Sequence, residues 1–239
     1  MNESRYVFYF SPHQDDELLN LGTAMCKDID AGREVFCVLC TDGGASGARR
    51  LIGNCGGCQW HEGAHDHPLT VAAFSAARDR EFTASCLAMG LRPDHIMIPA
   101  DRAPDGQLTA AHAAEIMRNA VKDFPAEQVT VKTLAEVTWQ RQNPDHTAVA
   151  RAALQLRAEN ACAAAEEYLE TILFPAPERS DILATLTPDA AQRERLLAAA
   201  ANYGRWEPEN GFYAVGCHSV WDEFDEFQRE QFSRLLVRL

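Results

Sequence analysis

The sequence lacks long apolar runs, an excess of basic residues and the glycine patterns of nucleotide-binding loops. No apolar stretch approaches the roughly 18 residues that a membrane-spanning helix requires. The formal net charge of −13 argues against a nucleic-acid partner or an anionic membrane surface, because both favour a basic face. Neither the dinucleotide-binding nor the P-loop glycine pattern is present, so nucleotide binding has little support.

Targeting signals and disulfides are equally scarce. The first residues, MNESRYVFYF, lack the basic start, apolar centre and small-residue cleavage site of a signal peptide, so a cytoplasmic protein is expected. Eight cysteines in 239 residues do not suggest a disulfide framework, and Cys26, Cys37, Cys40 and Cys86 lie in apolar segments typical of buried thiols. The sequence leaves open both a monomer and a homo-oligomer.

The order of apolar and helical segments predicts a single α/β domain over residues 1–239. With 46% hydrophobic residues, a chain of this length can bury a substantial core. Residues 6–10 and 35–41 are apolar runs that predict strands, and residues 16–31 carry apolar positions at helical spacing. Strand, helix and strand in this order indicate a Rossmann-like, mostly parallel sheet with helices on both faces.

Further segments extend this pattern to a core of about residues 5–175. The expected strands lie at 95–99, 129–134 and 168–175, and the expected helices at 71–89, 108–124 and 146–159. Residues 42–68 show no strong periodicity, so we expect a functional loop or lid there. A C-terminal helical extension is expected over about residues 187–239, with one helix from Thr187-Pro188 to Gly204 and an aromatic-rich helix at 221–236.

Four ionisable residues follow the first predicted strand in the stretch SPHQDDE. Ligands of open α/β sheets bind beyond the carboxyl ends of the strands. His13 and Asp16 can converge on one ion across the strand-to-helix turn, and Asp15 lies between them, free for another role. Imidazole plus carboxylate suits Zn²⁺ or Fe²⁺, and a catalytic metal usually has three protein ligands. The stretch QNPDH after the fourth predicted strand supplies a third candidate, His146.

An acidic N-cap would explain part of the first motif without a metal. Acidic side chains at a helix N-terminus interact favourably with the helix dipole. Capping does not require His13, however, and a second histidine at another helix start favours the metal site.

The two motifs resemble the signatures of a known family. SPHQDDE resembles the HPDDE signature of the GlcNAc-PI de-N-acetylase (PIG-L/LmbE-like) family, and NPDH resembles its later HPDH motif. RDREFTASCLAMGL is similar to the family's Arg-x-x-Glu helix, which puts Arg78 and Glu81 on its positions. IPADR is similar to the family segment that carries an aspartate after the third strand, here Asp101. The resemblance covers residues 6 to 160.

The resemblance implies a zinc-dependent hydrolase, with Fe²⁺ or another divalent metal as alternatives, that removes an N-acetyl group from an amino-sugar conjugate. It implies His13, Asp16 and His146 as metal ligands and Asp15 as the general base. Such a metal lowers the pKa of a bound water toward ~7. Arg78 would suit a charged anchor for substrate hydroxyls or phosphate, although a lone helix arginine is more often in a surface ion pair. The expected partner is a small-molecule amino-sugar substrate.

The sequence departs from the family pattern at two positions. Gln14 replaces the usual proline, a minor change because Pro12 already rigidifies the approach. Asn143 replaces the first histidine of HPDH, which the resemblance implies polarises the carbonyl or helps protonate the leaving amine. Asparagine can donate a hydrogen bond to an oxyanion but cannot supply a proton. Either Asp15 then does all the acid–base work or another histidine, such as His218, contributes; a structural role for His218 is at least as reasonable.

The segment CGGCQWHEGAHDH concentrates cysteine and histidine within the predicted loop. Cys55, Cys58, His61, His65 and His67 could form a second, structural zinc site. Zinc ribbons usually separate their ligand pairs by about a dozen or more residues, whereas this segment is compact. The competing interpretation is a lid that contributes to substrate recognition.

Two other function classes remain as alternatives to the hydrolase. A receiver-like signalling domain would use Asp15, Asp16 and Asp101, but it needs about half this length and gives His13 and His146 no role. The second alternative is a non-catalytic metal- or nucleotide-binding protein of the same fold. Its glycine-rich stretch TDGGASG is better interpreted as a turn than as a nucleotide-binding loop. Bound metal and acetate release distinguish these classes.

Overall fold

The first four strands along the chain lie close to where the apolar runs predict them. The computed structural model describes residues 4–58, 60, 63–136, 143–170 and 182–238. Its strands are β1 (Tyr6–Ser11), β2 (Glu34–Leu39), β3 (Ile96–Met97), β4 (Val129–Leu134), β5 (Ala164–Leu169), β6 (Ala184–Leu186), β7 (Trp206–Glu207), β8 (Phe212–Tyr213) and β9 (Ser233–Arg238).

Seven of these strands form one sheet, and β7 pairs with β8 in a separate hairpin. The order is β3-β2-β1-β4-β5-β9-β6, with the first five strands parallel and β9 antiparallel to both of its neighbours. The chain leaves β1 toward β2 and β3 on one side and returns to β4 and β5 on the other. The strand order therefore reverses between β1 and β4, the position where ligands of Rossmann-like sheets bind.

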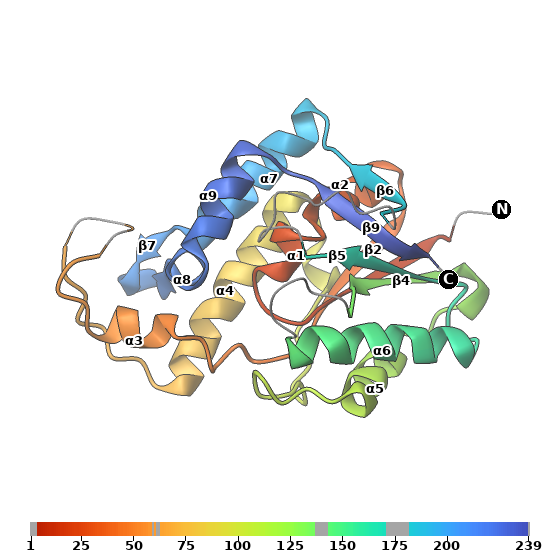
Figure 1. Cartoon of the computed structure of the whole chain (residues 1–239), viewed down its shortest axis with the longest axis horizontal. Helices are drawn as coiled ribbons and strands as arrows, with labels where there is room; N and C mark the ends of the chain where they lie inside the picture. The colour runs from red at the N-terminus through yellow and green to blue at the C-terminus, as the bar shows by residue number, and fades with distance from the viewer. Residues whose placement is uncertain (1–3, 59, 61–62, 137–142, 171–181, 239) are drawn as a thin grey trace.

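Helices cover both faces of this sheet (Figure 1). They are α1 (Asp16–Leu19), α2 (Gly22–Asp30), α3 (Ala48–Gly53), α4 (Val71–Met89), α5 (Ala110–Val121), α6 (Pro144–Ala158), α7 (Ala190–Tyr203), α8 (Val215–Ser219) and α9 (Trp221–Arg229). Helices α5 and α6 lie along one face, and α2, α7 and α9 lie on the opposite side. The predicted Rossmann-like α/β fold is confirmed.

The alternation of side chains along β1 explains the two layers of core. Val7 and Tyr9 pack in the cluster that includes residues of α1, α2, α4, α7 and α9. Phe8 and Phe10 point to the opposite face, where they pack with α5 and α6. Because successive side chains of a strand face opposite ways, a fully apolar run must be covered on both sides.

Three predicted elements of the expected core, residues 5–175, differ from the structure. The helix expected at 16–31 is broken between α1 and α2, where the Asn20 side chain donates to Asp16 Oδ1 (3.1 Å) and the Leu21 N–H reaches back to Asp16 O (3.3 Å). The loop expected at 42–68 contains the short helix α3. The strand expected at 168–175 begins earlier, at Ala164, and residues 171–175 lie outside the described part.

The C-terminal segment also differs from the prediction. The N-cap of α7 is Asp189, not Thr187, because the Asp189 carboxylate accepts from the Gln192 N–H and completes a capping box. The helix expected at 221–236 ends at Arg229, and β9 follows as a strand between β5 and β6. The expected helical extension is thus only partly helical, because sheet pairing prevails over the local helical period. Among the described helices, none has both the length and the apolar character to cross a membrane.

Candidate active site

The turn from β1 into α1 is fixed by hydrogen bonds that fold it back on itself. The His13 N–H donates to Asp16 Oδ2 (3.1 Å), and Thr41 Oγ1 donates to the Pro12 carbonyl (2.8 Å). Asp15 has φ 117° and ψ −37°, a conformation that residues other than glycine rarely adopt. Backbone strain of this kind costs about 1–3 kcal/mol and is typical of functional sites.

Three side chains converge at this turn and at the start of α6. His13 Nδ1 lies 3.2 Å from Asp16 Oδ2, His146 Nε2 lies 3.2 Å from the same oxygen, and the two nitrogens are 3.3 Å apart. Ligands about 2.0–2.1 Å from a tetrahedral zinc are separated by about 3.3 Å. The three donor atoms are therefore spaced as ligands of one small divalent cation would be.

Carboxylates hold the outer nitrogens of the two imidazoles. His13 Nε2 lies 3.0 Å from Asp145 Oδ2, and Asp145 also accepts the backbone N–H groups of Gly106 (2.7 Å) and Leu108 (3.0 Å). His146 Nδ1 lies 3.3 Å from a Glu170 oxygen, a close ionic contact without hydrogen-bond alignment. Carboxylates in this position orient metal-binding histidines and increase their basicity.

Two further carboxylates, those of Asp105 and Asp145, lie at the Nε2 atom of His13. Asp105 Oδ1 lies 3.4 Å from this nitrogen, and Asp145 completes the group. The Asp105 carboxylate accepts the Ala45 N–H (3.1 Å), and Asp145 accepts two backbone N–H groups. A neutral imidazole carries one N–H and one lone pair, so the Nε2 atom suits donation to these carboxylates and the Nδ1 atom suits a cation.

The charges of the cluster favour a positive centre. Burial alone would lower the pKa of His146, but Asp16 beside it raises that pKa to about 9. Burial likewise opposes protonation of His13, yet Asp105, Asp145 and Asp16 together raise its pKa well above the usual range. Burial would raise the pKa of Asp16, but the two histidines lower it far below its usual value. Protons and a divalent cation therefore compete for the same donor atoms.

Asp15 stands beside this cluster and is held by Arg78. The guanidinium is buried and donates to Asp15 Oδ2 (3.1 Å), the Gln14 carbonyl (2.6 Å) and the Gly43 carbonyl (3.0 Å). Burial raises the pKa of Asp15 to about 7, and the charge of Arg78 opposes that rise. The structure thus places Arg78 in a buried ion pair with Asp15 and not in a surface one.

The remaining sequence candidates are placed differently. Asn143 is the N-cap of α6, and its Oδ1 accepts the Asp145 N–H (3.0 Å). Asp101 is exposed, and its backbone carbonyl lies 2.8 Å from His112 Nε2. Asp105, four residues later, reaches the site instead. His218 lies in a separate cluster with Cys58 and His65.

Sequence reasoning missed several acidic residues around the site. Asp145 directly precedes His146, so its position at a helix start carried a usable signal. Glu170 follows β5, again at the carboxyl end of a strand. Glu223, from α9, has its pKa raised to about 9 by burial and by the charges of Asp15 and Glu170, which places it near the site. No local pattern links Glu223 to residues two hundred positions earlier.

Fold and site together define an α/β protein with a histidine–aspartate cluster at the carboxyl edge of a Rossmann-like sheet. The family model described as PIG-L, GlcNAc-PI de-N-acetylase, matches residues 8–157. The chain belongs to this family. A comparison of the sequence with curated proteins finds no match.

Solved structures of deacetylases share this fold. A triple mutant of a deacetylase of the teicoplanin biosynthetic pathway has a TM-score of 0.65 at 17% identity, covering 98% of each chain. The N,N'-diacetylchitobiose deacetylase of Pyrococcus horikoshii has a TM-score of 0.63 at 15% identity, covering 98% of this chain and 84% of that one. The zinc-inhibited form of teicoplanin deacetylase has a TM-score of 0.62 at 17% identity, covering 98% of each chain. At sequence identities this low, the structural similarity establishes a common fold and nothing more.

Proposed function

We propose that the protein is a metal-dependent hydrolase that removes an N-acetyl group from an amino-sugar conjugate. Membership of the de-N-acetylase family supports the reaction type. The observation that carries the proposal is the triangle of His13 Nδ1, Asp16 Oδ2 and His146 Nε2, with sides of 3.2–3.3 Å, beside the buried carboxyl of Asp15. A cation site next to a base is one arrangement that can hydrolyse an amide with water as the nucleophile.

His13, Asp16 and His146 would hold the cation, and Asp15 would move the protons. A divalent cation at this position supplies Lewis acidity, which lowers the pKa of a water and stabilises negative charge on an amide oxygen. Asp15 accepts the proton of the attacking water as the new carbon–oxygen bond forms. The carbon–nitrogen bond then breaks, and Asp15 returns the proton to the leaving amine. Arg78 keeps the carboxyl in place through the 3.1 Å contact with Oδ2.

Asn143 is proposed to assist as a hydrogen-bond donor. Its Oδ1 atom is used by the Asp145 N–H, so the amide NH₂ group points elsewhere and can donate to a developing oxyanion. Because an amide does not titrate, it supplies no proton to the amine. The placement of His218 in another cluster leaves Asp15 as the proposed acid.

Zinc is the proposed cation, with Fe²⁺ and other divalent ions as the alternatives. Two imidazoles and one carboxylate are a donor set that several first-row ions accept. One of the related structures is described as a zinc-inhibited form, so zinc can occupy such a fold without supporting turnover in that protein. The metal that supports activity is therefore to be determined by reconstitution with Zn²⁺, Fe²⁺, Co²⁺ and Mn²⁺ separately.

The decisive experiment is a screen for acetate release from acetylated amino-sugar conjugates, with and without a chelator. We expect release that the chelator abolishes and that one of the divalent ions restores. The diacetylchitobiose deacetylase and the deacetylase of the teicoplanin pathway among the structural neighbours make soluble N-acetylglucosaminyl compounds the first substrates to test. Metal binding without acetate release from any of them would instead favour a non-catalytic metal-binding protein.

A further inference from the structure

A second group of possible metal donors lies in the loop between α3 and α4. The backbones of Cys55 and His65 pair with each other, with N–O distances of 3.2 and 2.9 Å, and the Cys58 N–H donates to the Gly63 carbonyl (3.1 Å). These bonds hold Cys58 and His65 close together. The loop directs the thiol of Cys58 and the buried ring of His65 toward α8.

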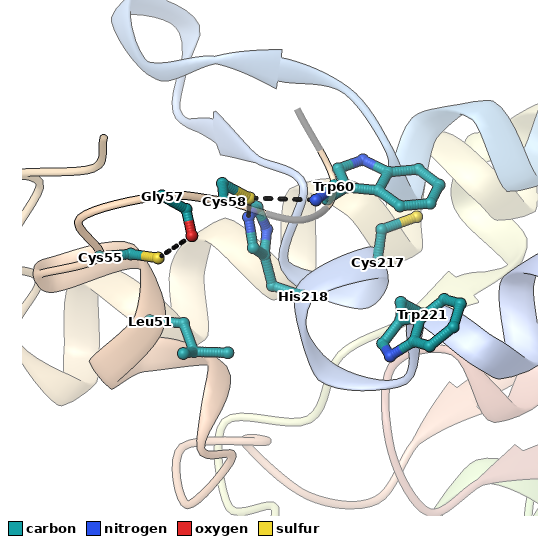
Figure 2. A pocket seen from close by; sticks show the side chains of 8 residues that line it. All are labelled: Leu51, Cys55, Gly57, Cys58, Trp60, Cys217, His218 and Trp221. Carbon is teal, nitrogen blue, oxygen red and sulfur yellow. Dashed lines mark hydrogen bonds between the residues drawn. The ribbon is translucent and has the colours of Figure 1, made fainter. Parts of the chain in front are cut away.

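His218 of α8 completes this group, and Figure 2 shows its ring beside Cys58. Its Nε2 atom lies 3.3 Å from Cys58 Sγ and 3.3 Å from His65 Nε2, and all three donor atoms lie within 4.8 Å of one another. Around a tetrahedral zinc, with Zn–S about 2.3 Å and Zn–N about 2.0–2.1 Å, sulfur and nitrogen are about 3.5 Å apart and two nitrogens about 3.3 Å apart. The two separations from His218 Nε2 are close to these values.

The hydrogen bond of His218 fixes which of its ring nitrogens carries the hydrogen. His218 Nδ1 lies 2.7 Å from the Ala214 carbonyl, so this nitrogen carries the hydrogen and Nε2 carries the lone pair. Burial lowers the pKa of His218, and burial together with His218 lowers the pKa of His65. Neutral imidazoles are the ligating form, and a carbonyl partner on the other nitrogen is typical of metal-bound histidine.

The surroundings of the thiol suit a bound ion. The backbone N–H of Trp60 donates to Cys58 Sγ (3.3 Å), a contact that stabilises negative charge on the sulfur. A cavity of about 500 Å³ adjoins the group and is lined by Cys58, His218, Cys217 and Trp221, among others. The Cys55 sulfur lies in the same cavity but donates to the Gly57 carbonyl (3.0 Å). The open side offers a fourth coordination position to water.

We propose that Cys58, His65 and His218 form a second metal site that binds Zn²⁺. One thiolate and two imidazoles select a borderline-soft ion of this kind over Mg²⁺ or Ca²⁺. This site shares no side chain with the cluster of His13, Asp16 and His146, so it does not depend on the proposed hydrolase activity.

The ion would connect Cys58 and His65 to α8, which in turn contacts α4. Glu81 of α4 accepts the backbone N–H groups of Val215 (2.8 Å) and Gly216 (3.0 Å), which fixes the start of α8. His218 follows within the same short helix. A metal bridge from His218 to Cys58 and His65 therefore connects the loop, through α8, to the helix that carries Arg78.

Cobalt substitution of the full chain tests the site, because a thiolate ligand gives Co²⁺ a near-ultraviolet charge-transfer band that nitrogen and oxygen ligands do not. We expect the band in the wild-type protein and in the His13→Ala variant, whose active-site cluster is incomplete. Cys58→Ser should abolish the band and lower the bound Zn²⁺ by one ion per chain. The matched control, Cys55→Ser, should keep both.

A histidine variant and a stability measurement complete the test. His218→Ala should weaken Co²⁺ binding at the thiolate site at least tenfold, because two ligands remain. In the His13→Ala background, added Zn²⁺ should raise the unfolding temperature, and Cys58→Ser should remove that rise. The assignment is overturned if wild-type protein with bound Co²⁺ shows no thiolate band, or if Cys55→Ser removes the band while Cys58→Ser keeps it.

Discussion

Single charged side chains set the protonation and orientation of their neighbours in this site. Asp145 contacts the Nε2 atom of His13, Glu170 lies against His146, and Arg78 fixes Asp15. Each of these partners is buried or half-buried, so the contacts act in a low dielectric and are poorly screened by salt. Variants that keep the shape of a side chain and remove its charge should therefore separate metal binding from proton transfer.

The first prediction concerns Asp15. Asp15→Asn keeps the size of the side chain and removes its basicity. Turnover should fall by about 10²–10⁴-fold, the usual contribution of a positioned general base, while the metal content stays unchanged. Acetate release and elemental analysis of the same preparation measure the two effects. Near-normal turnover in this variant would remove Asp15 from its proposed role.

The second prediction concerns Asp145, which contacts His13 and not the proposed cation. Asp145→Asn should weaken metal binding at the His13 cluster by about 10–100-fold, because the imidazole loses its charged partner. Competition with a chelator of known affinity measures this in the Cys58→Ser background, where only one site remains. Asp101→Asn serves as the control, since the Asp101 side chain is exposed. Equal affinities in the two variants would contradict the role of Asp145.

The third prediction is a shift of the pH–rate profile. Asp15 must be deprotonated to act as a base, so kcat/KM rises with pH through its pKa. Arg78 lowers that pKa, and its removal must therefore raise it. In Arg78→Met the rising limb should move to higher pH, whereas Arg78→Lys, which keeps the charge, should shift less. An unchanged limb in Arg78→Met would show that another group controls it.

At the level of elements, the starts of helices position the chemistry. Asn143 caps α6 and orients the first turn, which carries both Asp145 and His146. The β1–α1 turn does the same for His13 and Asp16 through backbone bonds. Two short segments, far apart in sequence, thus form the site because β1 and β4 are neighbours in the sheet.

The fourth prediction separates the two roles of Asn143. Asn143→Ala should lower the free energy of unfolding by about 1 kcal/mol, the usual cost of a lost N-cap, and lower turnover by about 10²–10³-fold, the cost of one oxyanion donor. Asn143→Asp keeps the cap but has no amide N–H, so it should retain stability and lose turnover. Wild-type turnover in Asn143→Asp would leave capping as the role of this residue.

Local patterns in the sequence identified elements whose signals are also local. The α4 helix runs from the Thr70 cap to Gly90, whose φ of 105° suits glycine, and both ends were readable. The pair His13 and His146 was also readable, because each lies at or just before the start of a helix that comes after a strand. The site residues that escaped prediction, such as Glu223, depend on how distant helices pack. For the same reason β9 was mistaken for helix, since its conformation depends on pairing with β5 and β6.

At the scale of the whole molecule, β9 connects the end of the described chain to its core. Leu235 packs in the cluster that contains Val7 and Tyr9 of β1, and Ser233 Oγ accepts the Ala24 N–H (3.2 Å). The strand therefore contributes apolar burial as well as backbone pairing. Loss of either contribution should lower the free energy of unfolding of the whole domain.

The fifth prediction measures that contribution. Leu235→Ala should lower the free energy of unfolding by about 2–5 kcal/mol, as other buried leucines do when truncated. Leu87→Ala is the matched control: Leu87 is 43% exposed, and the change should cost at most about 0.5 kcal/mol. Chemical denaturation of both variants provides the comparison. A Leu235→Ala protein as stable as Leu87→Ala would show that β9 adds little to the fold.

The position of β9 also has a consequence for biosynthesis. In the main sheet, β6 pairs only with β9 among the described strands, and β5 has β9 as its outer neighbour. During translation β5 and β6 are synthesised well before β9. The backbone edge of β5 therefore stays unpaired until β9 has been synthesised. Unpaired edges of this kind favour association with other chains. The nascent protein thus passes through a stage at which chaperones that shield strand edges would raise its yield.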